Sequence, residues 1–175
     1  FAERGAVVAA NDISPINVEE VVDGIIARGG KAKAYVEDIA KKVGVQAVVN
    51  SVEDDFGVID ILVNHAAVEP HGPLLKMDEW DWHRTLDVNL TGAFLTIQSA
   101  GRIIRKKGSG AILNIVAGSG SSLGEEAGAY PASMAGLVAL SHQADRELSP
   151  LGIRVYAVEN SADVVKDVIR ILEAQ

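Results

Sequence analysis

The sequence predicts an α/β fold of the doubly wound class, in which a mostly parallel sheet carries helices on both faces. Short apolar, β-branched runs alternate with longer amphipathic segments along the chain. Such alternation implies right-handed crossovers and parallel strands. About five strands are expected in 175 residues, whereas the eight units of a closed α/β barrel typically take ~250 residues. The open sheet is therefore favoured.

The first half of the chain contains three expected strands and two expected helices. Residues 6–10 are strand-like and residues 16–28 are helical. A second strand over residues 31–36 is followed by a helix over residues 39–56. Residues 58–63 are apolar throughout and predict a strand buried on both faces, as parallel strands are.

The second half contains a long helix that begins at Asp78, after a loop rich in proline and glycine at residues 69–73. Its apolar residues recur at helical spacing, so one continuous stripe is expected to be buried. The stripe consists of Trp82, Leu86, Leu90, Ala93, Ile97, Ala100 and Ile104. Further strands are expected at residues 111–116 and 153–158, and further helices at residues 129–148 and 162–172.

Composition indicates one domain spanning residues 1–175, with 48% hydrophobic and 23% charged residues. There is no cysteine, and the four histidines lack metal-ligand spacing, so no metal is expected. A net charge of −8 argues against nucleic-acid binding, and the basic residues at 102–107 are those of a helix end. No apolar run approaches the ~18 residues of a membrane span and no secretory signal is evident, which predicts a cytoplasmic protein.

Five motifs lie at predicted strand ends and in two predicted helices. They are Asn11-Asp12, Glu37-Asp38-Ile39, residues 60–67, Asp87-Val88-Asn89 and the segment around Tyr130. In order and spacing they resemble the short-chain dehydrogenase/reductase family, from residue 1 to about residue 158. This resemblance implies a Rossmann-like fold, an NAD(P) cofactor and hydride transfer.

The resemblance implies a cofactor site built around two acids. Asp12 is similar to the residue that binds the adenosine ribose, and its charge would repel a 2′-phosphate, which implies NAD in preference to NADP. Asp38 resembles the acid that accepts from the adenine amino group, with Ile39 beside the ring. From position alone, Asp12 also suits a turn and Asp38 a helix N-cap.

Three further motifs correspond to the rest of the family's site. Asn64, Ala66 and Ala67 stand in the loop whose backbone passes close to the cofactor, although Ala67 replaces a glycine, whose backbone freedom it lacks. Asn89 matches an asparagine that helps to hold an active-site water. Tyr130 matches the general acid/base.

Two catalytic positions differ from the family pattern. Met134 stands where a lysine follows the tyrosine by four residues, and Ala117 stands where a serine precedes it by thirteen. An unassisted tyrosine has a pKa of about 10, so roughly one phenol in a thousand is ionised at pH 7. A lost oxyanion-type donor typically costs about 10²- to 10³-fold in rate. Ser119, Ser121 and Ser122 follow Ala117 in the sequence, but their spacing from Tyr130 does not fit the family pattern. With neither the lysine nor the serine in place, reduced activity is expected.

The family's glycine-rich turn and its strand have no counterpart before Asn11, and Glu159-Asn160-Ser161 replaces the usual Pro-Gly. We expect this chain to be part of a longer polypeptide, without its start and without an internal stretch of the substrate loop after residue 158. In the family that strand lies between the strands that here end at Asp12 and Asn64. Its loss predicts either an unfilled slot or direct pairing of these two strands.

The first interpretation of function is an NAD-dependent oxidoreductase acting on a small-molecule alcohol or carbonyl substrate. A second is an NAD-binding or non-binding pseudoenzyme, which Met134 and Ala117 favour. A third is a structural oligomer subunit, because two long helices match those that the family buries in homodimers and homotetramers. Oligomerisation is compatible with either of the other two.

Overall fold

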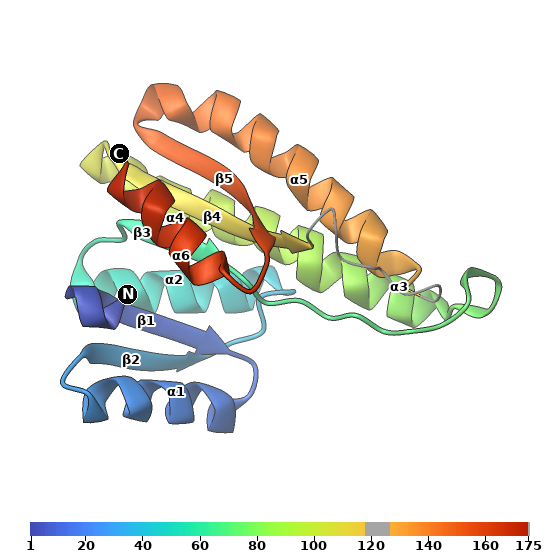
Figure 1. The fold of residues 1–175 in the computed structure, drawn as a ribbon, viewed down its shortest axis with the longest axis horizontal. Coiled ribbons are helices and arrows are strands. Elements are labelled where there is room, and N and C mark those ends of the chain that lie inside the picture. The colour runs from blue at the N-terminus through green and yellow to red at the C-terminus, as the bar shows by residue number, and fades with distance from the viewer. Residues whose placement is uncertain (118–126, 175) are drawn as a thin grey trace.

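Strands and helices alternate along the computed structural model, which describes residues 1–117 and 127–174 (Figure 1). The first half contains β1 (Val7–Asp12), α1 (Pro15–Ala27), β2 (Lys31–Val36), α2 (Lys42–Phe56) and β3 (Ile61–Asn64). The second half contains α3 (Glu79–Leu86), α4 (Ala93–Lys107), β4 (Gly110–Ala117), α5 (Ala129–Leu148), β5 (Ile153–Asn160) and α6 (Val164–Glu173). The predicted α/β alternation is confirmed.

All strand pairs are parallel, but the described strands form two sheets. β1 pairs with β2, and β3, β4 and β5 form a second sheet in that order. β1 and β3 are therefore not paired, and each has one edge without a strand partner among the described residues. Of the two arrangements expected from the sequence, the structure has the unfilled one.

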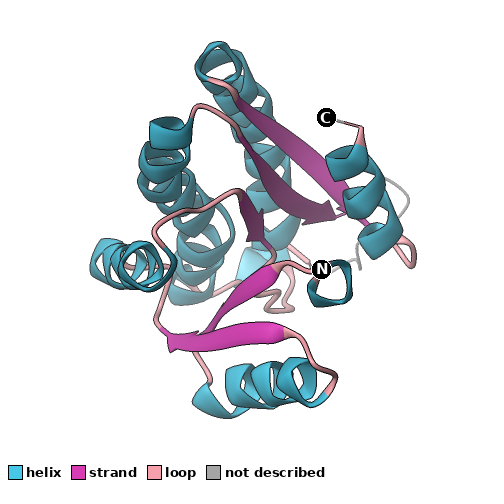
Figure 2. Ribbon diagram, turned by 90° about the vertical axis from the view of Figure 1, so that its left-hand side faces the viewer, coloured by secondary structure: helices cyan, strands magenta, loops and turns pink. Residues whose placement is uncertain are grey.

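Helices cover both faces of the larger sheet. Successive side chains of β4 point to opposite faces, so they pack against different helices. Ile112 packs in one cluster with Ile104 of α4 and Ala144 of α5. Leu113, the next residue, packs in another cluster with Val168 of α6. Figure 2 shows α6 on the side of the sheet opposite to the long helices. β4 is accordingly the most buried strand.

The prediction of a strand buried on both faces at residues 58–63 was wrong. β3 is shorter, and only Leu62 packs into the clusters of α2 and α4. Ile61 and Val63, which point to the opposite face, are 40% and 37% exposed. The apolar pattern of this strand was correct, but its burial depends on neighbours that the described chain does not provide.

The long helix predicted from Asp78 is confirmed, because α3 continues without a break through a π-helical segment (Asp87–Gly92) into α4. The wider π turn lies where the Asn89 side chain is buried and where Gly92 approaches the Ile39 carbonyl. π segments in helices frequently occur at functional sites. The stripe is fully buried only in α4, at Ala93, Ile97, Ala100 and Ile104.

Candidate functional site

A pocket of about 170 Å³ lies at the carboxyl ends of β1 and β2, beside the loop that follows β3. Doubly wound folds bind ligands at this end of their strands. The pocket is lined by Asn11, Asp12, Ile13, Glu37, Asp38, Ile39, Ala66, Ala67, Val68, Arg84 and Val88. The structure thus brings Asp12, Asp38, Ile39, Ala66 and Ala67, five of the residues predicted from sequence, to one site.

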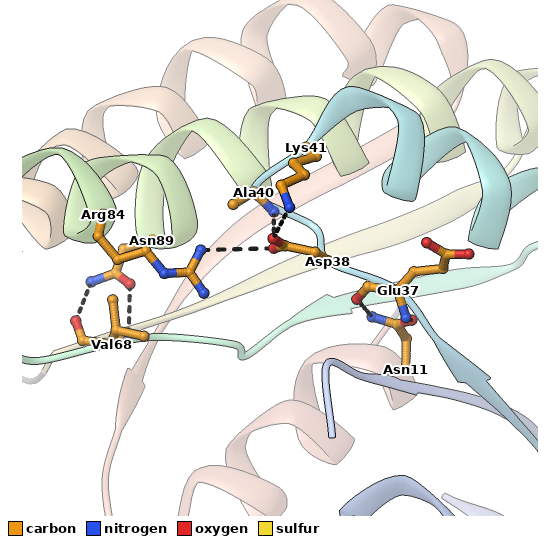
Figure 3. Close-up of polar contacts among 8 residues, drawn as sticks. All are labelled: Asn11, Glu37, Asp38, Ala40, Lys41, Val68, Arg84 and Asn89. Atoms are coloured by element: carbon orange, nitrogen blue, oxygen red, sulfur yellow. Dashed lines mark hydrogen bonds and ion pairs between the residues drawn. The ribbon is translucent and has the colours of Figure 1, made fainter. Parts of the chain in front are cut away.

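The ends of β1 and β2 are joined by the side chain of Asn11 (Figure 3). Its Nδ2 donates to the Glu37 carbonyl at 3.2 Å, and its Oδ1 accepts from the Glu37 amide at 3.1 Å. This pair of bonds continues the ladder between the strands beyond their backbone. It holds together the two strand ends at which the pocket-lining Asp12 and Asp38 lie.

Asp12 has the turn role that its position allowed. Its Oδ1 accepts from the Ser14 amide at 2.8 Å, and Ser14 in turn caps α1 by accepting from the Asn17 amide. The carboxylate is half-buried and lines the pocket. Turn formation and presentation of a carboxylate to the pocket are therefore compatible at this residue.

Asp38 does not cap α2, whose N-cap is Lys41. Instead its Oδ1 accepts from the Ala40 amide at 3.0 Å, which forms a turn that delays the helix to Lys42. Its Oδ2 lies 3.3 Å from Lys41 Nζ, and its Oδ1 lies 3.8 Å from Arg84 Nη1 (Figure 3). Burial alone would raise the pKa of Asp38, but the Ala40 amide, Lys41 and Arg84 together hold that pKa below its ordinary value.

Two glycines shape the Asp38-Ile39 segment. A Cβ on Gly44 in α2 would lie 2.4 Å from the Asp38 carbonyl oxygen, and a Cβ on Gly92 would lie 3.1 Å from the Ile39 carbonyl oxygen. Ile39 itself packs beside the buried cluster of α2 and α4. The backbone of this segment therefore packs directly against the backbone of α2 and of the π-helical segment.

Asn64 is turned away from the pocket into a polar network between strands and helices. Its Nδ2 donates to Asn114 Oδ1 at 2.8 Å, and its Oδ1 accepts from Thr96 Oγ1 at 2.7 Å. Asn114 continues the network by donating to Ser141 Oγ at 2.8 Å. The amide of Asn64 therefore holds β3 against β4 and α4.

The loop after β3 passes the pocket through exposed Ala66 and Ala67 and half-buried Val68. Among the described residues, positive φ angles occur only at glycines. Ala67 therefore adopts its conformation without the strain that replacement of a glycine suggested.

Asn89 joins three parts of the site. Its Oδ1 accepts from the Val68 amide at 2.8 Å, and its Nδ2 donates to the Val68 carbonyl at 3.0 Å (Figure 3). The same Nδ2 also donates to Ser133 Oγ at 3.0 Å, and Ser133 donates to the Tyr130 carbonyl at 2.7 Å. The 2% exposed Asn89 thereby connects the pocket loop to the first turn of α5.

Tyr130 lies in that first turn and is half-buried against apolar side chains. Met134 belongs to a buried cluster against which Tyr130 and Ala117 both pack. Burial, and secondly the Glu69 carboxylate, raises the pKa of Tyr130 above its ordinary value. The three positions of the family's catalytic pattern are thus together, but without a cation or a hydroxyl at 134 and 117. Ser119, Ser121 and Ser122 lie outside the described residues.

Sequence reasoning did not identify Arg84, Gly44 or Gly92. A helix-interior glycine is a signal for close packing, so Gly44 and Gly92 were detectable as candidates. Arg84 gave no comparable signal, because its partner Asp38 lies in a different element far along the chain.

A second pocket, of about 580 Å³, lies at the opposite, amino end of β4 and β5. It is lined by Ser109, Gly110, Gly152, Arg154, Tyr156, Ile171 and Ala174. Doubly wound folds do not use this end for their ligands, so we assign the site to the smaller pocket. In the basic segment at the end of α4, Lys106 pairs with Glu53 at 2.5 Å and Lys107 pairs with Asp60.

Within residues 1–117 and 127–174, no group of three or more histidine, cysteine or acidic side chains is placed to hold a metal ion. In the same residues, no helix combines the length and apolar character that crossing a membrane requires.

Known proteins resemble this chain in sequence. It is 40% identical over 164 residues to (2S)-[(R)-hydroxy(phenyl)methyl]succinyl-CoA dehydrogenase subunit BbsD of Thauera aromatica. That match covers 90% of this chain and 63% of the relative, so the chain spans less than two thirds of the relative's length.

Solved structures resemble it in fold. NAD⁺-bound xylitol dehydrogenase superposes with a TM-score of 0.85 at 31% identity, covering 90% of this chain and 61% of that one. A metagenomic short-chain oxidoreductase in complex with NADP superposes with a TM-score of 0.90 at 28% identity, covering 99% and 82%. The sequence model described as short chain dehydrogenase matches residues 1–162. The chain therefore belongs to the short-chain dehydrogenase family.

Proposed function

We propose that the pocket at the ends of β1 and β2 binds the adenosine part of NAD and that the chain takes part in hydride transfer to or from an alcohol or carbonyl carbon. The observation that carries this proposal is the convergence of Asp12, Asp38 and the Ala66-Ala67 backbone on one pocket at the carboxyl ends of the strands. Asp12 offers acceptors to ribose hydroxyls, and Asp38 offers acceptors to the adenine amino group.

When bound, the nicotinamide supplies the hydride-transfer chemistry. In this proposal Tyr130 moves the proton at its phenol oxygen, and Asn89 positions the loop and the first turn of α5. Because the pKa of Tyr130 is raised, the phenol is protonated near neutral pH and is suited to donate a proton to a carbonyl oxygen. Alcohol oxidation needs the phenolate, which is scarce under those conditions.

Preference for NAD over NADP follows from the charges of the pocket. Asp12, Glu37 and Asp38 line it, and Arg84, the cation among the lining residues, is paired with Asp38. A 2′-phosphate would add charge of the same sign as these carboxylates. The proposal predicts that calorimetry gives at least about tenfold tighter binding of NAD than of NADP.

Asp12→Asn tests that preference, because the amide oxygen can still accept from Ser14 while the charge is removed. This variant should reduce the difference in binding affinity between NAD and NADP. Asp23→Asn, an exposed change on α1, should leave that difference unchanged. Equal or tighter binding of NADP by the unsubstituted chain would contradict the NAD preference.

Catalysis is tested by hydride-transfer assays with NAD and a panel of secondary alcohols. We expect slow turnover that increases at least about 10²-fold in an Ala117→Ser, Met134→Lys double variant, because a donor and a cation return beside Tyr130. A melting curve of each variant controls for folding. Binding of NAD without turnover in either form would favour a pseudoenzyme, and no binding at millimolar NAD would refute the cofactor site.

We also propose self-association through α4 and α5. Phe94 on α4 is 44% exposed, and α5 presents exposed Ala132, Ala135 and Ala139 at helical spacing. Light scattering coupled to size exclusion should show a homodimer or homotetramer that Phe94→Glu dissociates, whereas Val21→Glu on α1 should not. A monomeric unsubstituted chain would contradict this proposal.

A further inference from the structure

Arg84 lies at the junction of two parts of the site. It belongs to α3, whereas Asp38 follows β2, and both side chains line the same pocket. They are also partly shielded from solvent, with 29% and 20% of their side-chain surface exposed. An ion pair of this kind is screened less than one on the open surface.

Each oxygen of Asp38 already has one local partner. Oδ1 accepts from the Ala40 amide at 3.0 Å, and Oδ2 lies 3.3 Å from Lys41 Nζ. A carboxylate has about four acceptor sites, so both oxygens keep capacity for a ligand.

Arg84 attracts this carboxylate electrostatically without using one of its hydrogen-bond acceptor sites. The 3.8 Å between its Nη1 and Asp38 Oδ1 is within ion-pair range but longer than a hydrogen bond. Lys41, the other cation, is 70% exposed and does not line the pocket. Arg84 is therefore the partner that acts from the ligand side.

We propose that Arg84 is a positioning residue for recognition of the adenine base. It holds the Asp38 carboxylate ionised and aimed into the pocket, where the carboxylate accepts from an exocyclic amino group. This inference rests on the proposed nucleotide site and adds to it a determinant on α3 of which base is bound. The pair also connects α3, which continues into the π-helical segment that contains Asn89, to the Asp38 side of the pocket.

Calorimetric titration with three nucleotides tests this role. Adenosine monophosphate carries the amino group, inosine monophosphate has a carbonyl in its place, and nicotinamide mononucleotide lacks the adenosine half. Arg84→Gln should weaken binding of adenosine monophosphate by about three- to tenfold and reduce its advantage over inosine monophosphate. Binding of nicotinamide mononucleotide should be unchanged. Arg84→Lys should restore part of the loss, and Arg102→Gln, an exposed change on α4, should have no effect.

The pH dependence supplies a second readout. Around Asp38 the charged groups are Lys41 and Arg84, with Asp12 and Glu37 also lining the pocket. The acid limb of adenosine monophosphate binding should move to higher pH in Arg84→Gln, because the carboxylate of Asp38 is protonated more easily.

The outcomes separate this inference from the proposed function. If the unsubstituted chain binds adenosine monophosphate but Arg84→Gln leaves the affinity unchanged, or weakens all three nucleotides equally, the inference is overturned and the nucleotide site stands. If the unsubstituted chain does not bind adenosine monophosphate at millimolar concentration, both are overturned.

Discussion

At the scale of single residues, the departures from the family's catalytic pattern are packed against one another. Met134 is 5% exposed in a cluster with Ala93, Val116 and Leu137, and Ala117 and Tyr130 pack against it. The unbranched thioether fills the space among these side chains. The replacement of the cation by Met134 therefore has a structural counterpart, because the side chains that Met134 packs among are apolar.

Met134→Lys should change the pH profile of Tyr130. In the unsubstituted chain, alcohol oxidation should rise by roughly tenfold per pH unit between about pH 7 and 9, because the rate follows the phenolate fraction below the raised pKa of Tyr130. A lysine ammonium beside the phenol would lower that pKa and flatten the rise. Initial rates across this range, with Tyr130→Phe as the inactive control, measure the effect.

Glu69→Gln separates the two causes of the raised pKa. Removing this carboxylate should move the profile only slightly to lower pH, since burial is the larger cause. A shift as large as that of Met134→Lys would contradict this ranking. An equally steep rise in Met134→Lys would show that residue 134 does not act on the phenol.

Gly44→Ala should destabilise the fold and weaken nucleotide binding. The added Cβ would lie 2.4 Å from the Asp38 carbonyl oxygen, so backbone must move, at a cost of about 1–3 kcal/mol. This exceeds the gain of up to about 1 kcal/mol in helix propensity. Gly24→Ala on α1 is the matched control, because its Cβ would meet an atom only at 3.7 Å. Chemical denaturation should show loss in the first and a small gain in the second, and equal stability gains would refute the steric argument.

At the scale of elements, polar side chains fix how helices and strands meet. Asn89 connects the π-helical segment to the loop after β3 and to α5. Asp145 connects α5 to β5, because its Oδ1 accepts from Arg154 Nε at 3.0 Å and from the Val155 amide at 2.9 Å. Burial alone would raise the pKa of Asp145, but the Val155 amide, Arg154 and His142 hold that pKa below its ordinary value.

The Asp145 contact should stabilise the fold in a pH-dependent way. Since the folded pKa is lowered, the stabilisation is present above the unfolded pKa of about 3.9 and is lost as the pH falls through the folded value. Asp145→Asn should therefore cost about 1 kcal/mol at pH 7 and progressively less below about pH 4. Urea unfolding at several pH values measures this, with Asp23→Asn, an exposed change on α1, as the control. A cost independent of pH would show that charge is not involved.

At the scale of the whole molecule, the division into two sheets leaves strand edges and apolar side chains exposed on the surface. β1 and β3 each carry an edge without a strand partner in the described chain, and Val7, Ile61 and Val63 are 50%, 40% and 37% exposed. Unpaired strand edges with apolar side chains are templates for association.

Val63→Lys should reduce concentration-dependent association of this chain, because a charge beside the open edge opposes pairing with another strand. Dynamic light scattering against concentration would measure it. Val21→Lys on α1, at a 55% exposed position away from both edges, should leave association unchanged. If both variants behave alike, association does not involve the edge.

Much of the fold could be predicted from the local pattern of apolar and polar residues. The bounds of β2 and α5 were predicted without error, and α2 differed only at its start, where the carboxylate of Asp38 forms a turn before Lys42. The site was less accessible. Asp12 and Asp38 were identified by motif, but the inward turn of Asn64 depends on Asn114 and Thr96, which come from other elements.

The sequence by itself determined the α/β alternation, the family and the chemical groups at positions 117, 130 and 134, because periodicity and residue identity are local properties. Only the tertiary structure decided that β1 and β3 remain unpaired and that the helix after Asp78 contains a π segment. It also decided that Arg84 pairs with Asp38 and that Tyr130 packs against the apolar cluster that contains Met134. These features depend on which distant segments become neighbours, and burial and charge act through that proximity rather than through spacing along the chain.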